Sequence, residues 1–315
     1  ALCTQNLATE LSPTIDDGSQ YFNTAIYTGT GSSHSITGLG FQPDFNWIKN
    51  RGAANSHNLR DSTRGVTKVL ASNLNVAEYT NAGYVTSFDS DGFSLADSGG
   101  DTNASGNTYV AWNWKANGSG VSNTDGSITS TVSANTTAGF SIVTYTGNGT
   151  QGATVGHGLG KAPAMIITKG RDQVTNFNTW HNSFSDNQYI ALDTTTAVGT
   201  DGNTFPDASD MTSTTFEIGS GSWINGNGNT FVAYVFADIE GYSKIGTYTG
   251  NGSTDGTFVY TGFRPAFIMA RSYDNAEGWT MIDNKREGFN VSNNWVSANA
   301  STAEYSGAQY TLIDI

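Results

Sequence analysis

The side chains of this sequence that could do chemistry are scattered, and their spacing forms no catalytic or metal-binding motif. The four histidines lack the His-x-His or helical HExxH spacing of a zinc site: His34, His57, His157 and His181. In the internal alignment described below, His57-Asn58 coincides with His181-Asn182, whereas the third copy has WTMID near there. We therefore interpret these two histidines as packing or strand-edge residues.

Two aspartates in the segment FDSDGF, Asp89 and Asp91, could offer oxygen ligands to Ca²⁺. A calcium loop needs six or more oxygens, and nothing nearby completes an EF-hand pattern. The matching segment of the second copy, TFEIGS, has neither aspartate. Because Asp-Gly is an ordinary turn pair, we interpret the segment as a solvated turn and keep both aspartates as weak calcium candidates.

Two carboxylates facing each other at about 5–10 Å could hydrolyse a glycosidic bond. The sequence does not place any two of its candidates across a cleft: Asp89, Asp91, Glu217, Asp238 and Glu240. It has no Gly-x-Ser-x-Gly elbow, and its single cysteine, Cys3, has no catalytic motif around it. We predict a protein that is not an enzyme and has no cofactor, and we keep polysaccharide hydrolysis as an alternative.

Aromatic side chains in polar or turn-rich segments could instead stack on sugar rings, while nearby amides and carboxylates bond the hydroxyls. Four residues have this context: Tyr79, Trp223, Tyr273 and Trp295. Such rings more often pack against a neighbouring domain, and isolated surface aromatics are common. We keep the four as candidate ligand-binding residues beside that packing interpretation.

Three further aromatic or aliphatic positions, Trp47, Ile167 and Phe267, align across the copies and predict sandwich core. Arg51, Arg171 and Arg271 also align, and an Asp-x-x-Arg pattern recurs at Asp61–Arg64 and Asp283–Arg286. We interpret the arginines as members of strand-end ion pairs, and an exposed pair contributes about 0–1 kcal/mol.

The composition excludes several classes of partner. The net charge of −13 disfavours binding to nucleic acids or anionic membranes, and no run approaches the ~20 apolar residues of a membrane helix. Charged residues make up only 13%, so Ser, Thr, Asn and the 38 glycines solubilise the surface and supply turns. The start has no initiating Met and no signal-peptide pattern, so we expect a piece of a longer polypeptide.

An internal repeat organises the chain. The segments YTGTGS, YTGNGT and YTGNGS begin at Tyr27, Tyr145 and Tyr248, and each is followed by a Pro-containing strand. The first two copies also share NTYVAWNW and NTFVAYVF, which begin at residues 107 and 229. Each Tyr-Thr-Gly segment predicts a strand end and a tight turn, with the Tyr packed inward and glycine at positive φ.

Short β-branched and aromatic runs between turns predict an all-β protein with little helix. The spacing of the copies suits tandem antiparallel β-sandwiches, concanavalin/SPRY-like or jelly-roll-like. We predict an N-terminal linker (1–20) from an upstream domain, copy 1 (21–126), copy 2 (127–241) and an incomplete copy 3 (242–315). Copy 2 carries an extra alternating stretch, SITSTVSA, and the short junctions favour a rod.

The counterpart of YVAW is absent from copy 3, whose last residues, YTLIDI, stand about where VTSFDSDGF and TTFEIGS stand in the other copies. A sandwich without its last strands exposes an edge and an apolar face. We therefore expect that the polypeptide continues or that another segment covers this edge.

Together, ALCTQNL, GLGFQPDFNWIKNR, HNLRDSTRG, TSFDSDGF and YVAWNWKANG resemble a family of repetitive β-domains in tail-fibre-like virion proteins of tailed bacteriophages. In those proteins a segment like ALCTQNL often follows a SPRY-like domain. The resemblance implies an extracellular virion appendage with a role at the host surface, and it supplies no catalytic residues.

The leading hypothesis is a tail-fibre or adhesin module on a virion, a homotrimer beside other virion proteins, that binds a host-surface glycan or protein. A structural spacer or head-decoration protein is the second hypothesis, and a polysaccharide depolymerase is the third. Since the repeated segments mark the scaffold, a localised function should lie where the copies differ.

Overall fold

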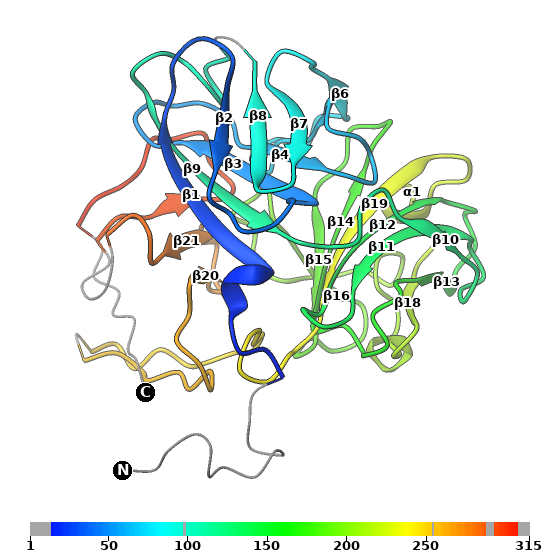
Figure 1. The fold of residues 1–315 in the computed structure, drawn as a ribbon. Coiled ribbons are helices and arrows are strands. Elements are labelled where there is room, and N and C mark those ends of the chain that lie inside the picture. Colours follow the sequence, from blue (N-terminus) through cyan, green and yellow to red (C-terminus); the bar gives the residue numbers. More distant parts are fainter. Residues whose placement is uncertain (1–13, 97–98, 254, 288–292, 308–315) are drawn as a thin grey trace.

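The computed structural model describes residues 14–96, 99–253, 255–287 and 293–307, and it is built almost entirely of antiparallel strands (Figure 1). The predicted all-β class is therefore confirmed. Helix is confined, in the described residues, to α1 (Ser222–Asn225) and two short 3-10 turns, Gly18–Gln20 and Ala208–Asp210.

Copy 1 is a sandwich of two sheets. The larger has the order β1 (Phe22–Thr28), β9 (Thr108–Trp114), β3 (Phe45–Asn50), β4 (Asn58–Asp61). The smaller has the order β2 (His34–Thr37), β8 (Gly92–Leu95), β7 (Val85–Asp89). A short hairpin lies beside them: β5 (Lys68–Val69) and β6 (Tyr79–Thr80).

Copy 2 repeats this plan and extends it. Its larger sheet has the order β10 (Val121–Asn123), β11 (Ser130–Asn135), β12 (Phe140–Thr146), β19 (Thr230–Phe236), β14 (Met165–Gly170), β15 (Asn178–His181), β16 (Gln188–Ala191), β17 (Gly199–Thr200). Its smaller sheet pairs β13 (Ala153–Gly156) with β18 (Thr215–Ile218). Strand β10, which precedes residue 127 but pairs with β11, and strand β11 itself extend this sheet beyond β12, whereas the matching sheet of copy 1 ends at β1.

The described part of copy 3 contains one sheet, with the order β20 (Phe267–Ala270), β21 (Thr280–Asp283), β22 (Val296–Ser297). These strands correspond to β3, β4 and β5 of copy 1. The stretch YTLIDI and the first thirteen residues of the linker lie outside the described residues.

The repeated Tyr-Thr-Gly segment has the predicted structure in copies 1 and 2. Tyr27 stacks on Tyr109 with ring centroids 5.1 Å apart, and Tyr145 stacks on Phe231 at 5.2 Å. The hydroxyl of Tyr27 donates to the carbonyl of Thr102, which is distant in the sequence. A Cβ on Gly29, two residues after Tyr27, would lie 2.3 Å from the carbonyl oxygen of Ala104, so only glycine allows this approach.

All three copies share one central core in addition to the cores inside the sandwiches. Apolar residues of the larger sheets meet there: Phe45 of copy 1 stacks on Tyr234 of copy 2 at 4.3 Å, and Trp112 of copy 1 contacts Phe267 of copy 3 at 5.7 Å. Trp279 of copy 3 donates to the carbonyl of Ala191 in copy 2. The copies therefore close around a centre, and the predicted rod is wrong.

Equivalent contacts link the copies in cyclic order. The backbone N–H of Glu78 in copy 1 donates to the carbonyl of Arg171 in copy 2. In the same way Glu304 of copy 3 donates to Arg51 of copy 1, and Val198 of copy 2 donates to Tyr273 of copy 3. The arrangement is a pseudo-three-fold ring in which each copy presents one surface to the next.

The register of the strand pairs corrects the alignment of copy 3 with the other copies. Phe267 pairs with Asp283 as Phe45 pairs with Asp61, so Phe267 is the counterpart of Phe45 and not of Trp47. The residue of copy 3 that corresponds to Arg51 and Arg171 is then Tyr273. All of the aligned apolar residues, Trp47 and Ile167 included, still contact the central core.

Arg271 instead takes the place of two buried lysines, Lys49 and Lys169. Each lysine donates to a carbonyl of the neighbouring copy, Ser301 and Asn75 respectively, and Arg271 donates to three carbonyls of copy 2. Burial lowers the pKa of both lysines to about 8. The sequence alignment matched Arg271 with Arg51 and Arg171 because all three are arginines, whereas its position in the structure is that of the two buried lysines.

The Asp-x-x-Arg pairs are buried, and their interpretation as exposed strand-end pairs is wrong. Asp61 and Arg64 have side chains with 0% exposure. Tyr234 of copy 2 donates to Asp61 at 2.8 Å, and Trp112 of copy 1 donates to Asp283 at 3.0 Å. Both pairs therefore join one copy to the next, and their contribution depends on complete pairing inside the core.

Glu78 bridges two copies, because it accepts from Arg64 of its own copy and from Arg171 of copy 2. We expect Glu78→Gln to lower the free energy of unfolding at pH 7 by about 2 kcal/mol, since Arg171 loses its carboxylate and the buried Arg64 keeps only Asp61. Urea unfolding measures this. Lys244→Gln, which removes an exposed pair with Asp238, is the control and should change stability by less than about 0.5 kcal/mol.

The pH dependence of the stability tests whether the ion pairs of Glu78 cause the stabilisation. Burial acts to raise the pKa of Glu78, but its bonds to Arg171 and Arg64 lower it below the ordinary 4.5. The stabilisation is thus present above pH 4.5 and is lost as the pH falls through the folded-state pKa. The difference between wild type and Glu78→Gln should shrink below pH 4.5; a difference that persists unchanged at pH 3 contradicts the ion-pair explanation.

Candidate functional site

The four candidate aromatic residues do not gather at one place. Tyr79 pairs with Val69 in the β5–β6 hairpin, and Trp295 occupies the matching hairpin of copy 3, where it stacks on Tyr305 at 4.2 Å. These hairpins correspond to each other. Tyr79 is 38% exposed, whereas the stacked Trp295 is half-buried.

The other two rings contact the scaffold. The indole N–H of Trp223 donates to the Thr204 hydroxyl, and its ring packs against the core of copy 2. Tyr273 is 39% exposed, and its ring contacts Phe184 of copy 2 with centroids 6.1 Å apart. The four rings therefore do not form a common sugar-binding platform.

The histidine alignment is also wrong, because His181 corresponds to Asp61 in the strand pairing. His57 is fully buried: its Nδ1 accepts from the Trp47 indole at 2.8 Å, and its Nε2 bonds the Ser297 carbonyl of copy 3 at 2.9 Å. Burial lowers the pKa of His57 to about 3, so the ring stays neutral. It is a packing residue, as interpreted.

Asp91 accepts from the backbone N–H groups of Gly38 and Gly40, and these bonds lower its pKa. Asp89 accepts from the Ser94 hydroxyl. Asp89 thus serves its own hairpin, and Asp91 joins that hairpin to the loop that follows β2. In the described parts of the chain no three His, Cys, Asp or Glu side chains gather as metal ligands would.

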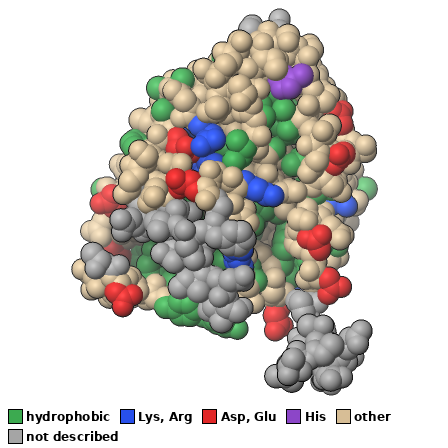
Figure 2. Space-filling view, turned by 60° about the vertical axis from the view of Figure 1, so that its left-hand side comes forward, with side chains coloured by type: hydrophobic (Ala, Val, Ile, Leu, Met, Phe, Trp, Pro, Cys, Tyr) green, Lys and Arg blue, Asp and Glu red, His purple; other side chains and the backbone are tan. Residues whose placement is uncertain are grey.

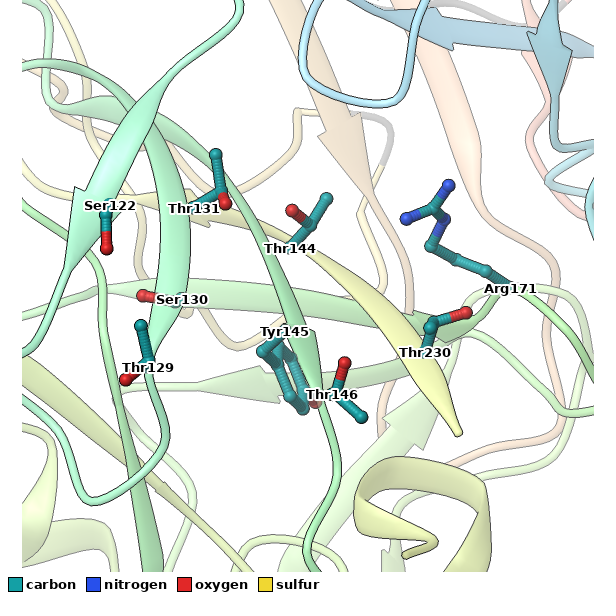
Figure 3. A pocket seen from close by; sticks show the side chains of 9 residues that line it. All are labelled: Ser122, Thr129, Ser130, Thr131, Thr144, Tyr145, Thr146, Arg171 and Thr230. Atoms are coloured by element: carbon teal, nitrogen blue, oxygen red, sulfur yellow. The ribbon is translucent and has the colours of Figure 1, made fainter. Parts of the chain in front are cut away.

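A hydroxyl-rich groove of about 190 Å³ lies on the larger sheet of copy 2 (Figure 3). Its lining is almost entirely polar, with Arg171 as its one charged residue: Ser122, Thr129, Ser130, Thr131, Thr144, Tyr145, Thr146, Arg171 and Thr230. Arg171 lies at one end beside Thr230, and Ser122 lies at the other, as Figure 3 shows. We call this the hydroxyl groove.

The strand sequence explains why the groove is polar. Along β12, Phe140 and Ile142 lie in the central core, and the next residues of that face, Thr144 and Thr146, lie in the groove. Thr144 stands directly opposite Thr131 of β11. This face of β12 changes from apolar to hydroxyl-bearing at the point where copy 1 no longer packs on it.

Hydroxyls arranged in rows can donate and accept hydrogen bonds, and Arg171 adds a cation that Glu78 already holds in place. The lining has no carboxylate and no histidine. Such a surface suits a neutral or weakly anionic polar ligand. It supplies no general acid or base for hydrolysis.

None of the groove residues was among the ligand-binding candidates drawn from the sequence, although Arg171 was expected to form a strand-end ion pair. The signal that could have found them is the extra alternating stretch SITSTVSA, which forms most of β11 and is the main addition in copy 2. Four of the nine lining residues come from β10, β11 or the segment between them: Ser122, Thr129, Ser130 and Thr131. The groove lies where copies 1 and 2 differ.

The geometry defines a class of protein built from repeated antiparallel β-sandwiches around a shared core. Residues 17–315 match a family model described as a domain of unknown function, DUF7483, so the chain belongs to that family. The match runs through all three copies. No curated protein and no solved structure matches the chain.

The described residues contain no helix with the length and apolar character needed to cross a membrane. On the face shown in Figure 2, uncharged polar surface predominates, and charged side chains are scattered among it. This agrees with a composition that has only 13% charged residues.

Glu217 is the most perturbed of the candidate carboxylates. It lies on β18 and is 8% exposed; burial, together with Asp210 and Asp207, raises its pKa to about 7. A raised folded-state pKa means that stability falls as the pH rises through about 7. None of these three carboxyl groups lines the hydroxyl groove.

We expect Glu217→Gln to raise the melting temperature by about 2 °C or more at pH 8.5, because it removes the cost of ionising this carboxyl. At pH 3.5, below the ordinary pKa of 4.5, Glu217 is protonated in both the folded and the unfolded state, and the variant should match wild type. Thermal scans at both pH values measure this. Glu240→Gln, at an exposed site, is the control, and an equal shift at pH 3.5 and 8.5 contradicts the proposed titration.

Proposed function

We propose that the chain is a non-catalytic binding module of a phage-type virion appendage, and that its hydroxyl groove contacts a glycan on the host surface. The observation that carries the proposal is the groove itself, a shallow hydroxyl-rich surface built partly from strands that copy 1 lacks. The appendage assignment rests on the sequence resemblance.

Three features support a glycan over other ligands. Rows of threonine and serine hydroxyls, with one arginine, match the alternating donors and acceptors of sugar hydroxyls. The net charge of −13 disfavours nucleic acid and anionic membrane surfaces. The small volume suits one or two sugar units, and an appendage that carries several modules, as a homotrimer would, compensates for weak single sites.

Hydrolysis of the glycan is not favoured by this geometry. Most glycosidases use paired carboxyl groups beside the bond, and the lining has no carboxyl group. A structural role is the second candidate, because strand β20 of copy 3 has an edge that another polypeptide strand could extend. In that role the protein connects virion components, and recognition of the host takes place elsewhere.

Binding to polysaccharides tests the proposal. The double variant Thr131→Val/Thr144→Val replaces a cross-strand pair of hydroxyls with methyl groups of similar shape, so the fold should remain intact. We expect retention on an immobilised host polysaccharide or on whole host cells to weaken about tenfold or more, since each lost hydrogen bond contributes about 0.5–1.5 kcal/mol. Surface plasmon resonance or a glycan array measures this.

A matched control is available in copy 1. Thr28→Val/Thr108→Val changes another cross-strand threonine pair, on a sheet that lacks the added strands, and should leave retention unchanged. Equal losses in both double variants place the binding outside the groove. Absence of retention on every host surface tested rejects the adhesin proposal and favours the structural role.

A further inference from the structure

The hydroxyl groove has a set of hydrogen-bond donors and acceptors that narrows the class of its ligand. Five of its hydroxyls make no hydrogen bond to any described residue: Ser122, Thr129, Thr131, Thr144 and Thr146. Each hydroxyl can donate one bond and accept two. A ligand that both donates and accepts can use this set fully, whereas a carboxylate or sulfate group only accepts. The inventory therefore favours the hydroxyl groups of a sugar over an anionic group.

The remaining hydroxyls of the lining are already committed. Ser130 and Tyr145 direct theirs into copy 2, where each donates to a backbone carbonyl. The hydroxyl of Thr230, at the Arg171 end of the groove (Figure 3), donates to the carboxylate of Asp172 at 3.2 Å. Thr230 can therefore offer the ligand only an acceptor, which a sugar hydroxyl can use and a carboxylate or sulfate group cannot.

The single cation of the lining is already neutralised. Arg171 donates through Nε and Nη2 to the two carboxylate oxygens of Glu78, at 3.0 and 3.1 Å. Glu78 also accepts from Arg64, and Asp61 pairs with Arg64 in turn. The charges of these two acids and two bases sum to zero. Arg171 can thus still donate through Nη1, which no described residue bonds, but it leaves no net positive charge for an anionic ligand.

Two further carboxylates lie near the ends of the groove. Asp172 is exposed and holds Thr230 at one end. Asp125, also exposed, lies in the segment between β10 and β11 that lines the other end, where Asn123 donates to it at 2.8 Å. Nearby charges dominate, because the Debye length at physiological salt is about 8 Å. The surroundings of the groove are therefore negative, in keeping with the net charge of −13 of the whole chain.

The residue at the position of Asp172 varies among the copies. Arg51 of copy 1 corresponds to Arg171 and makes the same kind of paired bonds to a glutamate. Gly52 follows Arg51, whereas copy 3 has Asp274 at the matching place. The scaffold therefore accepts residues with and without a carboxylate here. The charge of Asp172 is thus available for a role in the groove.

We infer that the hydroxyl groove binds an uncharged glycan and excludes acidic ones, with Asp172 as a residue that sets this preference. The inference rests on the proposed glycan binding and adds the class of sugar. Hydroxyls of a neutral sugar meet donors and acceptors along the groove, and one of them accepts from Nη1 of Arg171. A carboxylate or sulfate group on the same sugar meets Asp172 and Glu78 without an uncompensated cation.

An oligosaccharide array tests the inference on the 315-residue chain. Its probes are neutral gluco-, galacto-, manno- and N-acetylhexosamine chains, each beside the same chain with a carboxylate or sulfate group. We expect a neutral chain that is retained to bind about tenfold or more tightly than its acidic counterparts. Raising the salt from about 0.05 M to about 0.5 M should narrow this difference, because it screens the repulsion between exposed charges.

The outcomes separate the inference from the proposed function. Equal binding of a neutral chain and its acidic counterpart, or tighter binding of the acidic one, overturns the inference and leaves glycan binding in place. A preference for the neutral chain that salt does not change overturns electrostatic exclusion as its cause. No retention of any chain overturns the proposed function, and the inference with it.

The variant Asp172→Asn tests the residue itself. An Asn side chain can accept the bonds that Asp172 accepts from the N–H and hydroxyl of Thr230, so the local structure should be kept. We expect the ratio of neutral to acidic affinity to fall about threefold, since an exposed like charge is removed. Glu240→Gln removes one carboxylate from an exposed site outside the groove lining and should leave the ratio unchanged. An unchanged ratio in Asp172→Asn, or an equal fall in both variants, overturns the assignment of Asp172.

Discussion

The packing of the three larger sheets against one another is the constraint on which the structure depends. Phe45 and Trp112 belong to copy 1, yet one stacks on Tyr234 of copy 2 and the other contacts Phe267 of copy 3. In copies 1 and 2 the central strands of the larger sheet therefore bury both faces, one on the copy's own smaller sheet and one on its neighbours. This explains why β3 has no alternation of buried and exposed residues, although antiparallel strands often do.

A ring of sandwiches with a shared core needs polar groups that fix the order of the copies, because apolar contact is not directional. The buried pairs Asp61–Arg64 and Asp283–Arg286 have this position, and each bonds an aromatic donor of the next copy. Such pairs add little net stability over apolar residues, but they penalise any arrangement that leaves a charge unpaired. They are thus suited to specify which surface meets which.

The sequence predicted the parts of the fold that depend on local patterns. Short alternating runs predicted the all-β class, and the Tyr-Thr-Gly turns predicted that Tyr27 packs inward. Both predictions hold because the two-residue period of a strand and the conformation of glycine are properties of a few neighbouring residues. It did not predict the ring, since Glu304 meets Arg51 across more than 250 positions and no local signal encodes such a contact. The error in aligning Arg271 has the same origin: its role is defined by carbonyls of another copy.

The candidate site shows a related limit. Tyr79, Trp223, Tyr273 and Trp295 were chosen for polar neighbours in sequence, but stacking on Tyr305, contact with Phe184 or a bond to Thr204 occupies three of these rings. The hydroxyl groove depends on Thr131 and Thr144, which become neighbours only through the β11–β12 pairing. A single threonine in a strand gives no signal. Two threonines opposite each other on an uncovered face form a surface that can donate and accept hydrogen bonds.

The differences between the copies then have a common physical cause. A repeated scaffold keeps the rings and glycines that its turns and shared core require, so a copy can change only at its free edges without disturbing its neighbours. Copy 2 has gained β10 and β11 beyond β12, and the described part of copy 3 leaves the edge of β20 open. Both changes are made at the rim of a larger sheet, where backbone groups are available for pairing and where the central core is not affected.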